Sequence, residues 1–123
     1  MKLMIVDDSN IIRSRIERAY KKNKSIEIVA TARNGRDALE KANHLKPDLI
    51  TMDLTMPGMD GLQCIKHINK MDSEIKILVV SALSDVTTGL EAIESGARGF
   101  LCKPFTDEEL IAAIDQIITA DAY

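Results

Sequence analysis

The chain has 123 residues, of which 46% are hydrophobic, so it is long enough to bury the core of one domain. Its 16 basic and 19 acidic residues leave a net charge of −3, which does not favour a nucleic-acid-binding surface. No apolar run reaches the ~20 residues of a membrane span, and no signal peptide is recognisable. We therefore expect a single cytoplasmic domain over residues 1–123, with no nucleic-acid binding and no membrane insertion.

Short apolar runs rich in β-branched residues alternate with longer segments of helical periodicity. The runs predict strands at Leu3–Val6, Ile26–Ala32, Leu49–Met52, Ile77–Val80 and Phe100–Cys102. The first and fourth runs, LMIV and ILVV, are apolar at every position. Such runs indicate strands that are covered on both faces, as in a parallel sheet between two layers of helices.

A helix is predicted after each strand. The apolar positions expected to face the core are Ile12, Ile16 and Ala19, then Ala38, Leu39, Ala42 and Leu45, then Leu62, Ile65 and Ile68, then Leu90, Ile93 and Ala97, and finally Leu110, Ile114, Ile117 and Ile118. Thr106 and Glu109 predict a capping box for the last helix, and Asp60 predicts the N-cap of the third. Gly89 predicts a weak start to the fourth helix.

The alternation βαβαβαβαβα predicts an α/β fold, with right-handed crossovers that place helices on both faces of one parallel sheet. No linker, repeat or low-complexity tract divides the chain. A small basic run, Lys21, Lys22 and Lys24, follows the first helix and is interpreted as a solvated turn, with a docking patch as the alternative. Cys64 and Cys102 form no C-x-x-C pair and are expected to remain reduced.

Polar residues follow four of the predicted strands. Asp7 and Asp8 follow the first, Asp53 the third and Ser81 the fourth, while the fifth ends just before Lys103. Ligands bind outside the carboxyl ends of the strands in open α/β sheets, and all these residues fall on that edge. The sequence therefore predicts one site that combines three carboxylates, a hydroxyl and an ammonium group.

Three carboxylates at ~5 Å repel by roughly 3 kcal/mol per pair at an effective dielectric constant near 20. Protonation, Lys103 or a bound cation must offset this repulsion. All-oxygen ligands select a hard cation, so Mg²⁺ is expected, with Mn²⁺ as the alternative. A divalent cation, a lysine and a hydroxyl together indicate phosphoryl transfer, in which a carboxylate can itself be the nucleophile. Asp53, alone at the end of a central strand, is the best candidate for that nucleophile.

Four motifs carry a resemblance to a known family. They are Asp7-Asp8-Ser9, the segment Asp53-Leu54-Thr55-Met56-Pro57-Gly58-Met59-Asp60-Gly61, Val80-Ser81-Ala82 and Lys103-Pro104-Phe105. In their order and at these strand ends, they resemble the receiver domain of bacterial two-component response regulators. The resemblance covers essentially the whole chain. It implies a flavodoxin-like, doubly wound sheet of five parallel strands in the order 2-1-3-4-5, with five helices.

The resemblance also implies roles for individual residues. Asp53 matches the phosphoacceptor, Asp8 a direct Mg²⁺ ligand and Asp7 a ligand acting through water. The backbone carbonyl of Thr55 matches the position that completes the metal site together with Asp53. Lys103 matches the lysine that pairs with a phosphoryl oxygen, and its bond to Pro104 is expected to be cis.

Further positions match the switch of the family. Ser81 matches the hydroxyl that binds the phosphoryl group and moves with it, and Phe100 matches the aromatic residue that turns inward in response. Thr55 and Leu83 match the positions that set the lifetime of the aspartyl phosphate. Neither offers a side-chain amide that could orient a hydrolytic water molecule.

The implied function is a phosphorylation-activated switch that accepts a phosphoryl group from a histidine kinase. Activation is expected to change the face formed by the fourth helix, the fifth strand and the fifth helix, which then binds a protein target. A stand-alone regulator of the chemotaxis type is favoured, as a monomer, with a phosphorylated dimer as the alternative. A phosphate sink or relay, or a receiver excised from a larger response regulator, are the other interpretations.

Two functions outside this family are weighed against it. A phosphatase of the haloacid-dehalogenase type also forms an aspartyl phosphate, but it needs an acid two residues after the nucleophile, where this chain has Thr55. A flavodoxin-like electron carrier needs a phosphate-binding loop after the first strand, where this chain has two acids. We therefore expect no enzyme activity beyond the protein's own phosphorylation and dephosphorylation.

Overall fold

The fold is a parallel sheet between two layers of helices. The computed structural model describes residues 1–83 and 85–120. In chain order the described elements are β1 (Lys2–Val6), α1 (Asn10–Tyr20), β2 (Glu27–Ala32), α2 (Gly35–Leu45), β3 (Leu49–Met52), α3 (Gly61–Met71), β4 (Lys76–Ser81), α4 (Val86–Ser95), β5 (Gly99–Cys102) and α5 (Asp107–Ala120). The strands follow the order β2-β1-β3-β4-β5, and all neighbours are parallel. The predicted doubly wound fold is confirmed.

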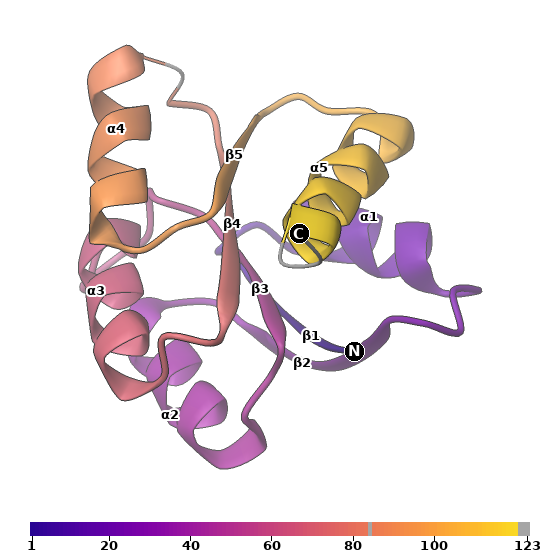
Figure 1. Cartoon of the computed structure of the whole chain (residues 1–123), viewed down its shortest axis with the longest axis horizontal. Coiled ribbons are helices and arrows are strands. Elements are labelled where there is room, and N and C mark those ends of the chain that lie inside the picture. The colour runs from indigo at the N-terminus through magenta and orange to yellow at the C-terminus, as the bar shows by residue number, and fades with distance from the viewer. Residues whose placement is uncertain (84, 121–123) are drawn as a thin grey trace.

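Helices α2, α3 and α4 cover one face of the sheet, and α1 and α5 cover the other (Figure 1). The fully apolar β1 serves both layers, since Met4 and Val6 belong to the hydrophobic cluster beneath α2–α4. Leu3 and Ile5 belong to the cluster beneath α1 and α5. All four side chains are at most 1% exposed. A strand with no polar position is therefore required here, because neither of its faces meets water.

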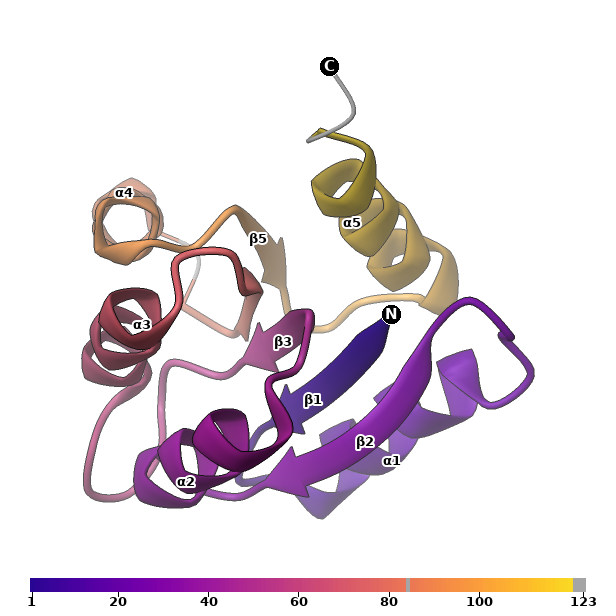
Figure 2. The same ribbon diagram turned by 60° about the horizontal axis from the view of Figure 1, so that its bottom comes forward.

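Strand β2 lies at one edge of the sheet, beside β1 (Figure 2). Its pairing with β1 contains a register shift, because Leu3 pairs with Ile28 whereas Met4 pairs with Ala30. Further along β2, the carbonyl of Thr31 accepts a hydrogen bond from Lys41 Nζ at 2.5 Å. The edge strand is thus irregular at one point and contacted by a lysine at another.

Side chains cap the helices as the local sequence predicts. The backbone N–H of Glu109 donates to Thr106 Oγ1 at 3.1 Å, and that of Thr106 donates to Glu109 Oε1 at 3.0 Å, so the predicted capping box is confirmed. Asp60 caps α3 by accepting from the N–H of Gln63 at 2.9 Å. The same type of cap occurs at the start of the other three helices, from Ser9, Asn34 and Asp85.

The predicted inner face of the fourth helix is wrong in part. Leu90 and Ile93 are 59% and 49% exposed, while Ala92 and Ser95 are the buried residues of α4. Ala97 is buried as predicted, but it lies beyond the end of α4. The reason is that α4 meets the rest of the molecule through small side chains, which leaves its large apolar residues outside.

Smaller differences concern the ends of elements. Ile26, predicted as the first residue of the second strand, is buried but precedes β2. Leu45, at the end of α2, is 39% exposed and is not part of the core. Over residues 1–83 and 85–120, no helix combines the length and apolar character that a membrane crossing requires.

Glycine substitutions test whether Gly89 lowers the stability of α4, as the sequence predicts. A Cβ at Gly89 would meet no atom within 4 Å, so we expect Gly89→Ala to raise the free energy of unfolding by about 0.5–1 kcal/mol. Urea unfolding measures this change, and amide exchange in α4, expected to be faster than in α5, should slow.

The matched control is Gly96→Ala at the end of the same helix. Gly96 has φ +123°, and its Cβ would lie 2.7 Å from Asn69 Cγ, so this variant is expected to be destabilised. A destabilised Gly89→Ala variant would show that the conformational freedom of Gly89 is needed in the native state.

Candidate functional site

Three carboxylates meet at the carboxyl edge of the sheet. Asp7 and Asp8 follow β1, and Asp53 follows β3. One carboxylate oxygen from each lies within 4.8 Å of the other two. Asp7 and Asp53 are buried, at 2% and 4% exposure, while Asp8 is exposed. The structure therefore brings together the three acids predicted from the sequence and opens their cluster to solvent at Asp8.

Lys103 supplies the positive charge of this cluster. Its Nζ lies 2.9 Å from Asp7 Oδ2 and 3.5 Å from Asp53 Oδ1. The backbone N–H of Lys103 donates to the carbonyl of Ser81 at 2.9 Å, which ties the β5–α5 loop to the end of β4. The Lys103–Pro104 peptide bond is cis, as predicted. One ammonium group thus bridges the two buried carboxylates.

The pKa of Asp53 is raised to about 6. Burial is the main cause, because it penalises the charged form, and the negative charge of Asp7 adds to it. Lys103 and a hydrogen bond from the Thr55 N–H to Asp53 Oδ1, at 3.4 Å, lower the pKa and offset part of the effect. Lys103 and this hydrogen bond therefore do not fully offset the cost of ionising Asp53, and a cation beside the carboxylate would stabilise its charged form.

The predicted switch residues lie around this cluster. Ser81 is fully buried, and its Oγ accepts a hydrogen bond from the Leu83 N–H at 3.1 Å. Thr55 and Leu83 are both exposed at the mouth of the site. Phe100, on β5, is half-buried and packs against the core cluster beneath α2–α4. Its side chain is therefore neither fully exposed nor fully inside.

Other residues contact the site although no sequence pattern predicted this role for them. Arg13 Nη1 donates to the carbonyl of Asp7 at 2.5 Å, and the Ser9 N–H donates to Asp7 Oδ1 at 2.9 Å. Gly61 is the first residue of α3, and a Cβ at this position would lie 2.4 Å from the Asp53 carbonyl oxygen. The close approach of α3 to Asp53 therefore needs glycine. The only sequence signal was the position of Gly61 directly after the capping Asp60.

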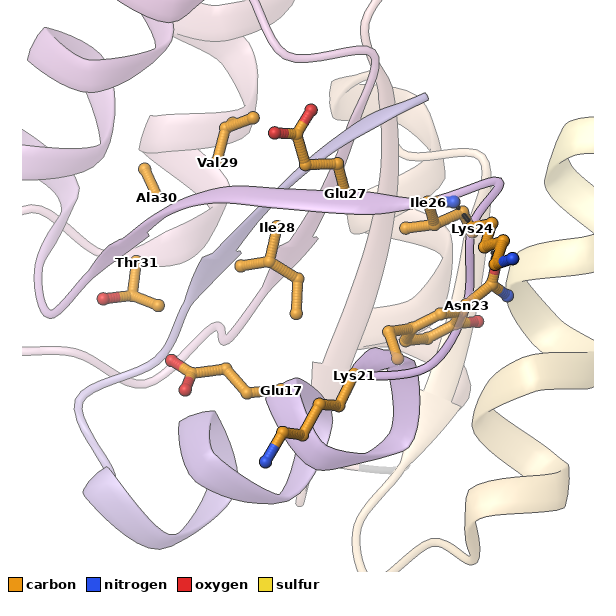
Figure 3. A pocket seen from close by; sticks show the side chains of 11 residues that line it. Glu17, Lys21, Asn23, Lys24, Ile26, Glu27, Ile28, Val29, Ala30 and Thr31 are labelled. Atoms are coloured by element: carbon orange, nitrogen blue, oxygen red, sulfur yellow. Dashed lines mark hydrogen bonds between the residues drawn. The ribbon is translucent and has the colours of Figure 1, made fainter.

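Away from the acidic cluster, a cleft of about 610 Å³ lies between the end of α1, the turn that follows it, and β2. We call it the second cleft. Figure 3 shows Glu17 of α1 and Lys21, directly after α1, on one side of it and Ile28 of β2 on the other. Tyr20 also lines this cleft and is buried, and its hydroxyl has no hydrogen-bond partner among the described residues. Burial, with Asp115 adding to it, raises the pKa of Tyr20 to about 12.

This second cleft holds no cluster of acidic or metal-ligating groups. Among the described residues, the acids at the carboxyl edge form the one cluster that could hold a metal ion. Lys21, Lys22 and Lys24 are exposed, as both a solvated turn and a docking patch require. The carboxyl edge is therefore the candidate functional site.

The donor set at that edge fits a hard divalent cation. Carboxylate oxygens are the ligands that Mg²⁺ prefers, and a magnesium site normally keeps several water ligands, which the open side at Asp8 permits. A buried carboxylate beside an ammonium group and a cation can accept a phosphoryl group, because both positive groups neutralise its oxygens.

Fold and site together define a class of protein, a doubly wound α/β domain with a cluster of three acids at the carboxyl edge of its sheet. The response regulator receiver domain family matches residues 3–115. The chain belongs to this family.

Similar proteins of known kind include chemotaxis proteins of about the same length. The chain is 40% identical to the chemotaxis protein CheY of Thermotoga maritima over 116 residues, which cover 94% of this chain and 96% of that one. It is 38% identical to CheY of Bacillus subtilis over 117 residues, covering 95% and 97%.

Solved structures agree with the fold. The receiver domain of Thermotoga maritima CheB has a TM-score of 0.86 at 29% identity, and the match covers 97% of this chain and 96% of that one. A complex of CheX, CheY, BeF₃ and Mg²⁺ from Borrelia burgdorferi contains a chain with a TM-score of 0.86 at 26% identity, with coverage of 100% and 90%.

The raised pKa of Asp53 makes stability depend on pH. Below about pH 4 the carboxyl is protonated in both folded and unfolded chains; between pH 4 and 6 the unfolded chain loses this proton while the folded chain keeps it. The contribution of Asp53 to the free energy of unfolding therefore falls as pH rises through this window. In chelator, Asp53→Asn should be more stable than wild type at pH 7.5, by up to about 3 kcal/mol, and nearly equal at pH 4.

Urea unfolding at both pH values measures the difference. Glu40→Gln, an exposed change of the same charge on α2, is the control and should leave the free energy of unfolding within ~0.5 kcal/mol of wild type. A wild type more stable than Asp53→Asn at pH 7.5 would contradict the electrostatic account.

Proposed function

We propose that this protein is a cytoplasmic signalling switch that is activated when a histidine kinase transfers a phosphoryl group to Asp53. The observation that carries the proposal is the geometry at the carboxyl edge, where three acids lie within 4.8 Å and Lys103 contacts two of them. Asp53 is the acceptor because it is buried at the end of a central strand, beside the ammonium group of Lys103.

The transfer step balances with the phosphodonor, Asp53 and one proton from water. A carboxylate oxygen of Asp53 forms a bond to phosphorus, the bond between phosphorus and the donor imidazole nitrogen breaks, and the imidazole keeps the electron pair and takes up a proton. Asp8, Asp53 and the backbone carbonyl of Thr55 would hold Mg²⁺ (or Mn²⁺), with Asp7 acting through water. The bound cation would neutralise charge on the phosphoryl oxygens. Lys103 would pair with one of those oxygens.

The switch would run through Ser81 and Phe100. Ser81 Oγ now accepts from the Leu83 N–H, so a hydrogen bond to a phosphoryl oxygen would move the start of the β4–α4 loop. Phe100 is half-buried, so turning inward as Ser81 moves would remove more of its ring from water. About 5.5 kcal/mol of differential stabilisation would invert a 1:99 equilibrium, which a few charge-assisted hydrogen bonds supply.

The output face is formed by α4, β5 and α5. Exposed apolar side chains lie along α4 at Val86, Leu90 and Ile93, spaced as one stripe of a helix, and Leu83 precedes them. Such a surface favours contact with a protein partner. The high coverage of the CheY relatives supports a target and a kinase of the chemotaxis type.

Phosphorylation is the decisive test. We expect wild type with Mg²⁺ and a phosphodonor to gain one phosphoryl group by intact mass, and Asp53→Asn to gain none. Lys103→Met should slow the reaction by about a hundredfold, because one charged group would no longer stabilise the transition state. Equal labelling of wild type and Asp53→Asn would refute the assignment of the acceptor.

The lifetime of the aspartyl phosphate tests Thr55 and Leu83. Both are exposed at the mouth of the site, and neither has a side-chain amide to orient water. After removal of donor, wild type should release phosphate severalfold more slowly than Leu83→Gln or Thr55→Asn. Faster release by wild type would contradict this role.

Target capture tests the output face. Wild type treated with beryllium fluoride and Mg²⁺ should capture a partner from cell lysate that Asp53→Asn does not capture. Leu90→Glu should lose this partner while still accepting a phosphoryl group. Retention of the partner by Leu90→Glu would place the target elsewhere on the surface.

A further inference from the structure

A cleft of about 700 Å³ opens beside the acidic site and shares Asp8 with it. One wall comes from the end of β2 and the start of α2, and the other from the loop between β3 and α3. The residues besides Asp8 are Arg33, Asn34, Arg36, Pro57, Gly58 and Met59. The cleft is therefore continuous with the place where a phosphoryl group would meet Asp53.

The backbone holds the two walls at a fixed separation. A Cβ at Gly35 would lie 2.9 Å from Met59 Cβ, so only glycine allows α2 to start this close to the opposite wall. Asn34 caps α2 through the Asp37 N–H at 2.8 Å. Gly58 has φ +79°, which lets the opposite wall turn back on itself. Arg33 and Arg36, on either side of Asn34 and Gly35, thus lie at a closely packed helix start in the cleft that Asp8 also lines.

The exposed Asp8 also lines this cleft, but no ion pair joins an acid to its two arginines among the described residues. Arg33 and Arg36 are exposed, and neither takes part in an ion pair within residues 1–83 and 85–120. The adjacent Asp37 is bound to Lys41 at 3.0 Å, and Asp60 is occupied in capping α3. Two guanidinium groups therefore face solvent next to a cluster of three carboxylates.

We infer that Arg33 and Arg36 recruit low-molecular-weight acyl phosphates as direct phosphodonors for Asp53, an inference that rests on the proposed function. An anionic donor is repelled by the three carboxylates, and the guanidinium groups in the adjacent cleft counter this repulsion and raise its local concentration. Guanidinium groups also bind phosphate and carboxylate oxygens with two parallel hydrogen bonds.

The chemistry of this donor is balanced. A carboxylate oxygen of Asp53 bonds to phosphorus, the bond between phosphorus and the acyl oxygen breaks, and the acyl carboxylate leaves with the electron pair. No proton is transferred. The departing anion is left beside the same two guanidinium groups.

The test is the rate of phosphorylation by acetyl phosphate with Mg²⁺, measured by intact mass. We expect Arg33→Ala/Arg36→Ala to lower the apparent second-order rate constant by about tenfold at low salt, and the difference to shrink in about 0.5 M salt. Lys22→Ala/Lys24→Ala, the same charge change at the opposite end of the sheet, is the control and should lose less than twofold. Arg33→Lys/Arg36→Lys should recover part of the rate.

Two further readouts separate the explanations. Phosphoramidate carries less negative charge and releases a neutral group, so the arginine variant should lose less with this donor. The Mg²⁺ affinity of the arginine variant should be unchanged or higher. If the affinity were weaker in proportion to the lost rate, the arginines would act through the metal site, and the inference would be overturned. Equal rates for the arginine and lysine variants would also overturn it.

The outcomes also separate this inference from the proposed function. If wild type gains no phosphoryl group on Asp53 from any donor, the proposed function fails. If wild type is phosphorylated on Asp53 and the arginine variant reacts as fast, the recruiting role alone fails.

Discussion

The arrangement of the carboxyl edge depends on one ammonium group between two buried carboxylates. Lys103 lies 2.9 Å from Asp7 and 3.5 Å from Asp53, and without it the two acids would face each other in the protein interior with no compensating charge. The topology forces this meeting, because β1 and β3 are neighbours and both end at the same edge. The loop that carries Lys103 must therefore return to β4, as its backbone hydrogen bond to Ser81 shows.

The single positive charge of Lys103 does not neutralise the three carboxylates of the site. The pKa of Asp53 is raised, first by burial and then by the charge of Asp7, so the charged carboxylate is disfavoured in the native state. A bound cation would stabilise the charged carboxylate, so cation binding at this edge would raise the free energy of unfolding. The neighbouring α4, with only Ala92 and Ser95 buried, is the element that such free energy could most easily displace.

Sequence patterns predicted the fold and the acidic cluster because both depend on strand ends. Apolar runs such as Leu3–Val6 locate the strands, and parallel topology then places the residues that follow them on one edge. The inner face of α4 was predicted wrongly because helical periodicity cannot tell an apolar stripe that packs on the sheet from one that faces solvent, as Leu90 does. The roles of Gly61 and Arg13 depend on backbone approach across the loops, which leaves no local pattern.

The irregular outer edge at β2 has a consequence for assembly. Regular strands at the edge of a sheet expose unpaired peptide groups that invite another strand to add on, and this is a route to aggregation. Here the register shift opposite Leu3 and Met4 disturbs the pattern that an incoming strand would have to match, and Lys41 already occupies the outward carbonyl of Thr31. Growth of the sheet by strand addition is thereby discouraged on the β2 side, which leaves β5 as the edge strand open to a partner.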